Sequence, residues 1–142
     1  IYRGKMNRIL SLDYGLVRVG MAVSDALKIT AQSLETLTID GDNTILLQKL
    51  KELKREYNLD TVVIGYPKHM NGDLSDTSKK IDELVPCIEA LDLKVIKWDE
   101  RLTTVMAHKT MRDLGIKQKD KKIHADRLAA MYILEDYLRY IS

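Results

Sequence analysis

A β-hairpin near the N-terminus constrains the fold of this chain more than any other feature. Arg8–Asp13 (RILSLD) is a mainly apolar run that reads as a strand. The next run, Val17–Ser24 (VRVGMAVS), alternates apolar residues with small or polar ones at a period of two. Only residues 14–16 separate the two runs, so we expect them to pair as an antiparallel hairpin.

After the hairpin, helical and extended patterns alternate along the chain. Further strands are expected over Leu34–Ile39, Thr61–Gly65 and Leu93–Trp98. Helices are expected from an N-cap at Asn43 to a stop at Asn58, over Thr77–Leu91, over Thr103–Leu114, and over Asp126–Tyr140. Pro86 interrupts the second of them, so we expect a kink or break near Val85. This order predicts an α/β fold: a mixed five-stranded sheet with an antiparallel three-strand start and helices on both faces.

Length and composition bound the class of protein. The 142 residues have the size of one domain, which we assign to 6–142; Met6 is a candidate native start, with residues 1–5 as an added remnant. The net charge of +2 is too balanced to argue for nucleic acid by itself, so any basic contact surface must be local. The single cysteine, Cys87, excludes an internal disulfide and favours a reducing, cytoplasmic compartment. No apolar run approaches the ~20 residues of a membrane helix.

Three acidic residues occupy positions where an acid is unexpected. Asp13 ends the first strand, on the same side as Ile9 and Ser11. Glu100 ends the last strand, on the same face as Ile96 and Trp98. Asp126 opens the final helix on its apolar face. If the first and last strands are near neighbours, and the final helix starts over their carboxyl ends, the three carboxylates meet. Such a cluster repels itself unless a cation neutralises it.

A carboxylate cluster of this kind suits a hard divalent cation. Mg²⁺ prefers oxygen ligands and is usually held by few carboxylates together with water and substrate phosphate. Two such ions about 4 Å apart can clamp the attacking and leaving oxygens of a phosphodiester. Spacing alone therefore indicates a metal site for phosphodiester chemistry, beside simpler explanations for each acid.

Each acid also has an explanation that involves no ligand. Asp13 would serve the turn or pair with Arg18. Glu100 would pair with Arg101 or a nearby lysine. Asp126 would complement the dipole at the start of its helix. The coincidence of the three positions favours the site, and the residues by themselves leave both explanations open.

Four segments carry a resemblance that goes beyond spacing: ILSLDYGLVRVGMAVSD, VVIGYPKHMNG, KWDERLTT and HADRLAAMYILEDYL. In this order they resemble the YqgF family, also called RuvX-like Holliday-junction resolvases or pre-16S ribosomal RNA nucleases, from Met6 to Leu138. The resemblance implies an RNase H-like fold, similar to that of RuvC-type resolvases. It also implies a metal-dependent nuclease of structured nucleic acid. We expect Mg²⁺ or Mn²⁺ as cofactor, processing of the 5′ end of precursor 16S ribosomal RNA as the first choice of reaction, and four-way DNA junctions as the second.

The resemblance also implies the residues of the site. Asp13, Glu100 and Asp126 match the three acids of the family, and we expect them to be the catalytic residues and metal ligands. Glu100 would be the third ligand or a base for the attacking water. Relatives such as RuvC carry an acid where this chain has Gly65, so Glu100 would replace it from a neighbouring strand, and the number of metal ions stays open. The expected nucleic-acid contacts are Gly15, Arg18, Asn71, Arg101, Thr103, Lys119, Lys121 and Lys122.

Several of these contacts have simpler explanations as well. Gly15 would let a phosphate approach the backbone, or would only allow the hairpin to turn. Arg18 and Arg101 suit bidentate phosphate contacts, although Arg101 equally suits an ion pair. The lysines fall in a charged stretch, Lys117–Ile123, which we expect to be a loop. Lysine is typical of solvated surfaces, but the position before Asp126 favours a backbone contact with the substrate.

Two functions of other classes compete with a nuclease. The segment LDYGLVRVG also resembles the phosphate-binding hairpin of actin-like ATPases and sugar kinases, but those proteins close two such domains over a nucleotide, and this chain has room for one. The chain would also serve as a non-catalytic nucleic-acid or protein-binding factor in transcription or ribosome assembly. A homodimer would suit symmetric cleavage of a junction, although no interface is evident in the sequence.

Overall fold

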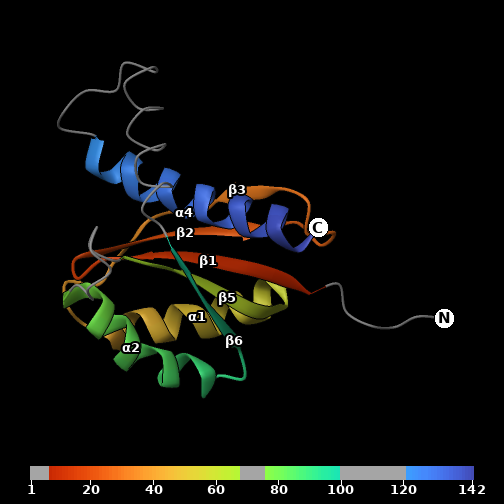
Figure 1. The fold of residues 1–142 in the computed structure, drawn as a ribbon. Helices are drawn as coiled ribbons and strands as arrows, with labels where there is room; N and C mark the ends of the chain where they lie inside the picture. The colour runs from red at the N-terminus through yellow and green to blue at the C-terminus, as the bar shows by residue number, and fades with distance from the viewer. Residues whose placement is uncertain (1–6, 68–75, 100–120) are drawn as a thin grey trace.

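A mixed sheet between helices forms the framework of the molecule. The structure, a computed structural model, describes residues 7–67, 76–99 and 121–142, with only the backbone described for 121–126. The elements are β1 (Arg8–Tyr14), β2 (Arg18–Ser24), β3 (Ala31–Ser33), β4 (Leu37–Thr38), α1 (Asn43–Tyr57), β5 (Leu59–Tyr66), α2 (Asp76–Glu89), β6 (Lys94–Asp99) and α4 (Lys121–Ile141). Helix α4 covers one face of the sheet, and α1 and α2 cover the other (Figure 1).

The predicted hairpin lies at the centre of the sheet. The strand order is β3-β2-β1-β5-β6, and β4 also pairs with β2. Strands β1 and β2 are antiparallel and pair from Leu10 with Val23 to Tyr14 with Val19, which confirms the hairpin. Strand β5 runs parallel to β1, and β6 runs parallel to β5. The carboxyl ends of β1, β5 and β6 therefore lie at one end of the sheet.

Alternation along the strands separates the buried side chains into two cores. The larger core lies against α1 and α2 and includes Leu10, Leu12, Val19, Met21, Leu46, Leu50, Val62, Ile64, Ile81 and Leu84. The smaller core lies under α4 and consists of Ile9, Ala22, Val63, Ala130, Ile133, Leu134, Tyr137 and Leu138. Helical spacing in the sequence predicts an inward face for Ala130, Ile133, Leu134 and Tyr137 on the last helix, and all four are buried. Neighbouring residues of a strand thus face different helices, which assigns a face to each polar strand residue.

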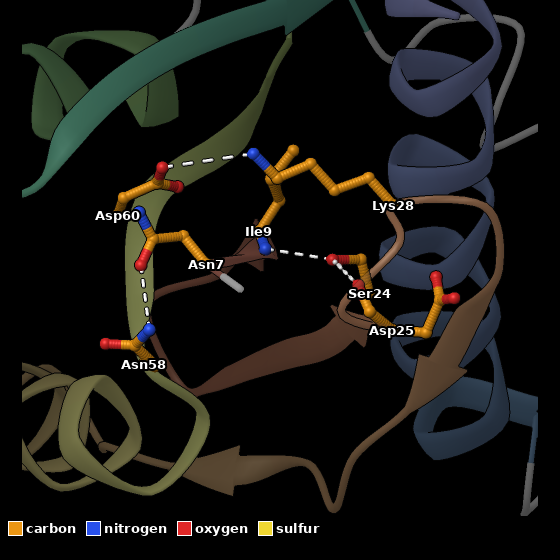
Figure 2. Close-up of polar contacts among 7 residues, drawn as sticks. All are labelled: Asn7, Ile9, Ser24, Asp25, Lys28, Asn58 and Asp60. Carbon is orange, nitrogen blue, oxygen red and sulfur yellow. Dashed lines mark hydrogen bonds and ion pairs between the residues drawn. The ribbon is translucent and has the colours of Figure 1, made fainter. Parts of the chain in front are cut away.

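Polar contacts anchor the end of the sheet at which β1 and β5 begin (Figure 2). The buried Ser24 hydroxyl accepts a hydrogen bond from the backbone N–H of Ile9 at 2.9 Å. The side-chain amide of Asn58 donates to Asn7 at 2.8 Å. These bonds hold the start of β1 against both of its neighbours, so the direction in which the strand leads to Asp13 is well defined.

The helices on the second face differ from expectation in small ways. The N-cap of α1 is Asp42 rather than Asn43, because the Asp42 carboxylate accepts a hydrogen bond from the Thr44 N–H at 3.0 Å. Asn58 ends this helix as predicted, with a left-handed φ of 54°. The expected break near Val85 is wrong, since α2 continues through Pro86 to Glu89; the alternative of a kink there stays a prediction. Because Pro86 lies in the last turn, few helical hydrogen bonds follow it.

Two other boundaries change the expected fold. The third strand, expected over Leu34–Ile39, is replaced by the short strands β3 and β4, which both pair with β2 and bring the described sheet to six strands. The final helix begins at Lys121, five residues before the predicted start at Asp126. The helix expected over Thr103–Leu114 lies outside the described residues. Within the described ranges, no helix combines the length and apolar character that a membrane crossing requires.

Candidate nuclease site

Asp13 lies at the end of β1, on the face that α4 covers. Ile9 belongs to the core under α4, whereas Leu10 and Leu12 belong to the opposite core. By this alternation Asp13 falls on the α4 face, as the sequence predicts, and its side chain is half-buried. Its partner across the hairpin is Gly20, so no β2 side chain covers the carboxylate from the directly opposite position.

One hydrogen bond holds α4 over β1. The fully buried Ser11 donates from Oγ to the backbone carbonyl of Ala130 at 2.6 Å. Asp13 stands two residues further along β1, about 7 Å away. Asp126 stands one turn before Ala130 on the same row of the helix, about 6 Å away. Helix α4 begins at the end of the sheet where β1 ends (Figure 1), so both steps lead the same way and bring the two backbone positions together.

The boundary of α4 corrects the expected setting of three residues. Asp126 lies in the second turn of the helix rather than at its start. Its proposed structural role as a partner of the helix dipole is weakened, because that interaction falls off within the first turn. Lys121 and Lys122 form the beginning of the helix instead of belonging to a loop.

The predicted acid Glu100 lies outside the described residues, but the strand that leads to it is described. The registers of β1 and β6 against β5 put Asp13, Gly65 and Trp98 at about the same level. Strand β5 separates β1 from β6, so the first and last strands are near neighbours without being adjacent. The strand ends at Asp99, directly before Glu100 in the sequence.

The hairpin turn accounts for Gly15 and places Arg18. A Cβ atom at position 15 would lie 2.7 Å from the Arg18 carbonyl oxygen, so the turn itself requires glycine. Arg18 is half-buried and begins β2 on the same face as Gly20. It is therefore a diagonal cross-strand neighbour of Asp13, on the face that α4 covers.

The remaining predicted contacts are not described. Asn71, Arg101, Thr103 and Lys119 lie outside the described ranges, as does Glu100. The side chains of Lys121, Lys122 and Asp126 are likewise not described. These residues stay predictions.

Trp98 connects β6 to the second half of α4. Its indole Nε1 donates a hydrogen bond to Asp136 at 3.2 Å. Its ring meets those of Tyr137 and Tyr140 edge-on, with centroid distances of 5.4 and 5.3 Å. The Trp98 side chain is half-buried between the strand and the helix. It defines the flank of α4 that faces β6.

A charged network ties α2 to the carboxyl ends of β5 and β6 on the other face of the sheet. Lys97 donates to Asp82 at 2.5 Å, and the Tyr66 hydroxyl donates to Asp82 at 2.8 Å. The hydrogen bond from Lys97 lowers the pKa of Asp82, and the same bond raises the pKa of Lys97. Burial and the contact with Asp82 raise the pKa of Tyr66. This network holds the ends of β5 and β6 against α2, on the face of the sheet opposite α4.

Sequence reasoning overlooked Arg127, which follows Asp126 in α4. Its side chain is half-buried, and its Nε is buried without a hydrogen-bond partner among the described residues. A charged side chain three residues before the fully buried Ala130 was the available signal. This signal was easy to overlook because charged residues surround Arg127 in the sequence, as is common near the start of a helix.

The described side chains do not by themselves make a metal centre. Among them, no group of three or more His, Cys, Asp or Glu residues is placed to hold an ion. Of the three predicted acids, only Asp13 has a described side chain. The predicted donors are all carboxylates, and this set of oxygen ligands fits Mg²⁺ or Mn²⁺.

Comparison with known proteins gives a consistent family. The model of the family described as "RuvX: Holliday junction resolvase" matches residues 7–140. A protein of Acetivibrio thermocellus named "Putative pre-16S rRNA nuclease" is 46% identical over 133 residues, which cover 92% of this chain and 94% of that protein. A protein of Ruminiclostridium cellulolyticum with the same name is 43% identical over 136 residues, covering 95% of this chain and 96% of that protein.

Solved structures agree in fold at much lower identity. The Thermus thermophilus RuvC structure in complex with a Holliday junction has a TM-score of 0.56 at 15% identity and covers 94% of this chain and 96% of that chain. The fowlpox virus Holliday junction resolvase has a TM-score of 0.59 at 17% identity, covering 95% of this chain and 99% of that chain. The predicted RuvC-like fold is thereby confirmed.

Proposed function

Because the chain belongs to the RuvX family, we propose that it is a metal-dependent endonuclease that processes the 5′ end of precursor 16S ribosomal RNA. Relatives named "Putative pre-16S rRNA nuclease" align over nearly the whole chain. An exposed, unpaired Cys87 suits the reducing cytoplasm, in which such a substrate is made.

The observation that carries the proposal is the hydrogen bond from Ser11 to Ala130. It supports a site between β1 and α4, because Asp13 and Asp126 follow from these two residues in the same direction. Gly20 opposite Asp13 supports it further, since a larger residue there would stand beside the carboxylate.

The residues have distinct roles in the proposed reaction. Asp13 and Asp126 are the metal ligands, and Glu100 is the third ligand or the base that takes a proton from the attacking water. When bound, a divalent ion supplies charge stabilisation at the phosphodiester and lowers the pKa of bound water. Arg18, beside Asp13 on the same face, holds a phosphate of the substrate through its guanidinium.

A second substrate, the four-way DNA junction, is favoured by the description of the matching family as Holliday junction resolvases. Both substrates present closely spaced phosphates around a branched or folded backbone, so one carboxylate site serves either. A junction has two symmetric strands to cut, and a homodimer of this chain would suit it.

The proposal is tested by incubating the protein with labelled precursor 16S RNA and with a labelled four-way junction, in Mn²⁺ and in Mn²⁺ with excess EDTA. The wild type should cleave at least one of the two substrates in Mn²⁺, and EDTA should abolish this cleavage. Asp13→Asn should lower the cleavage rate at least a hundredfold. Asp92→Asn is the matched control, because Asp92 is exposed in the turn before β6 and its φ of 65° suits asparagine equally well.

Three outcomes decide between the functions. Cleavage of RNA alone supports rRNA processing, and cleavage of the junction alone supports a resolvase. Binding without cleavage, unchanged in Asp13→Asn, would contradict the nuclease and support a non-catalytic factor.

A further inference from the structure

Arg127 places a buried side-chain nitrogen beside the proposed site with no hydrogen-bond partner among the described residues. Its Nε is buried and makes no hydrogen bond within the described part of the chain. An arginine side chain stays charged, so a buried donor of this kind is costly unless something accepts from it. Arg139, further along the same helix, shows the ordinary arrangement: its side chain is 66% exposed and pairs with Asp136 at 3.1 Å.

The helix geometry places Arg127 on the flank of α4 that faces away from β6. Arg127 and Asp136 are nine residues apart, about two and a half turns, and so lie on opposite sides of the helix. Asp136 accepts the hydrogen bond from Trp98 of β6. The sheet order continues from β6 through β5 and β1 to β2. Arg127 therefore lies on the flank toward β2, the strand that begins with Arg18.

The residues that follow Arg127 on its side of α4 show where it lies along the helix axis. Ala130 and Leu134 follow Arg127 at three and seven residues, and both are fully buried. Ala130 is also the residue that Ser11 bonds, two positions before Asp13 on β1. Arg127 thus stands one turn closer than Ala130 to the end of the sheet where Asp13 and Arg18 lie.

An ion pair with the preceding residue, Asp126, does not account for Arg127. Adjacent helical residues point in different directions, so Arg127 is poorly placed to pair with Asp126. A guanidinium instead offers planar donors that match a phosphate in a bidentate manner. An oxyanion from outside the chain would satisfy its donors.

We propose that Arg127 binds a phosphate of the nucleic-acid backbone and, with Arg18, forms an arginine pair on the β2 side of Asp13. The inference rests on the proposed function and names the flank on which the substrate backbone lies. It assigns to these two residues the phosphates beside the scissile one, while the carboxylates act on the scissile phosphodiester.

The test measures binding without cleavage. Fluorescence anisotropy in EDTA follows the binding of a short labelled single-stranded RNA and of a labelled four-way DNA junction across a series of salt concentrations. The variants are Arg127→Met and Arg127→Lys, with Arg139→Met as the matched control. Thermal unfolding of each variant is followed by circular dichroism.

Arg127→Met should weaken binding about tenfold or more at low salt, the loss expected for one charge-assisted contact. It should also reduce the slope of log K against log salt by about 0.7 for RNA or 0.9 for DNA. Arg127→Lys should restore the slope but not the full affinity, because an ammonium binds as a point charge. Arg139→Met should change neither. The melting temperature of Arg127→Met should not fall, since the substitution removes a buried donor, Nε, that makes no hydrogen bond within the described part of the chain.

The alternatives give different results. If the wild type binds a probe while Arg127→Met keeps its affinity and salt slope, the inference is wrong, and the nuclease proposal stands on the separate cleavage assay. A lower melting temperature with an unchanged slope would identify Arg127 as a structural residue and equally overturn the inference. A wild type that binds neither probe would contradict the proposed function itself.

Discussion

Ser11→Ala tests the contact that holds α4 over β1. The variant removes a fully buried hydroxyl that donates to the Ala130 carbonyl at 2.6 Å. A hydrogen bond of this kind contributes about 0.5–1.5 kcal/mol net, and the carbonyl keeps its acceptor role in the helix, so little further penalty is added. We therefore expect a loss of about 1 kcal/mol in the free energy of unfolding, or about 3–4 °C in melting temperature for a chain of this size.

Urea unfolding followed by circular dichroism measures this loss, and Ser142→Ala is its control. Ser142 also donates to a carbonyl of α4, that of Arg139 at 2.9 Å, but the contact is exposed. Its removal should cost less than about 0.5 kcal/mol. Because a small shift of α4 would displace Asp126 relative to Asp13, Ser11→Ala should also lower kcat roughly tenfold. Equal losses of stability in the two variants, with unchanged kcat, would refute the reasoning.

Three further substitutions test other parts of the structure. Gly15→Ala should cost about 1–3 kcal/mol in urea unfolding, because the added Cβ would lie 2.7 Å from the Arg18 carbonyl oxygen; a wild-type midpoint would mean that the turn has room. Asp82→Asn should reduce the fall in the free energy of unfolding at acid pH. The pKa of Asp82 is lowered in the folded protein, so its carboxylate stabilises the fold above about pH 4. This stabilisation is lost as the pH falls through the folded-state pKa. Since Asp82 and Lys97 are 36% and 44% exposed, the difference at pH 7 should not exceed about 1 kcal/mol, and parallel curves for the two proteins would contradict it. Asn58→Ala should cost about 1 kcal/mol, because Asn58 has a φ of 54°, and Asn58→Gly should cost less; the reverse order in thermal melts would exclude a backbone cause.

The sheet could be predicted where the sequence has a strong period. The alternation of apolar and other residues in β2 and the short turn at Gly15 define the hairpin locally. The β-branched run of β5 is also recognisable, because polar residues and a glycine flank it in the sequence. The short strands β3 and β4 were not separable by pattern, because two or three residues carry no period. Pairing with β2, a tertiary interaction, makes them strands.

The start of α4 was missed for a related reason. Its first turn is Lys-rich and has no apolar residue before Ile123, so it reads as a loop although lysine is a good helix former. The sequence pattern therefore places Asp126 at the start of the helix. The parity of Asp13 was predictable from β1 alone, but its closeness to Asp126 was not, since the crossing of α4 over β1 depends on packing and on the Ser11 hydrogen bond.

Titration of ¹⁵N-labelled protein with Mn²⁺, followed by paramagnetic broadening of backbone amide signals, tests most directly whether the acids share one ion. Gly20 lies opposite Asp13, and Ala130 lies one turn after Asp126. Their signals should broaden together at the lowest Mn²⁺ concentrations, and either Asp13→Asn or Asp126→Asn should abolish the effect at both. Broadening at only one of the two positions, or at both in either variant, would contradict a shared carboxylate site.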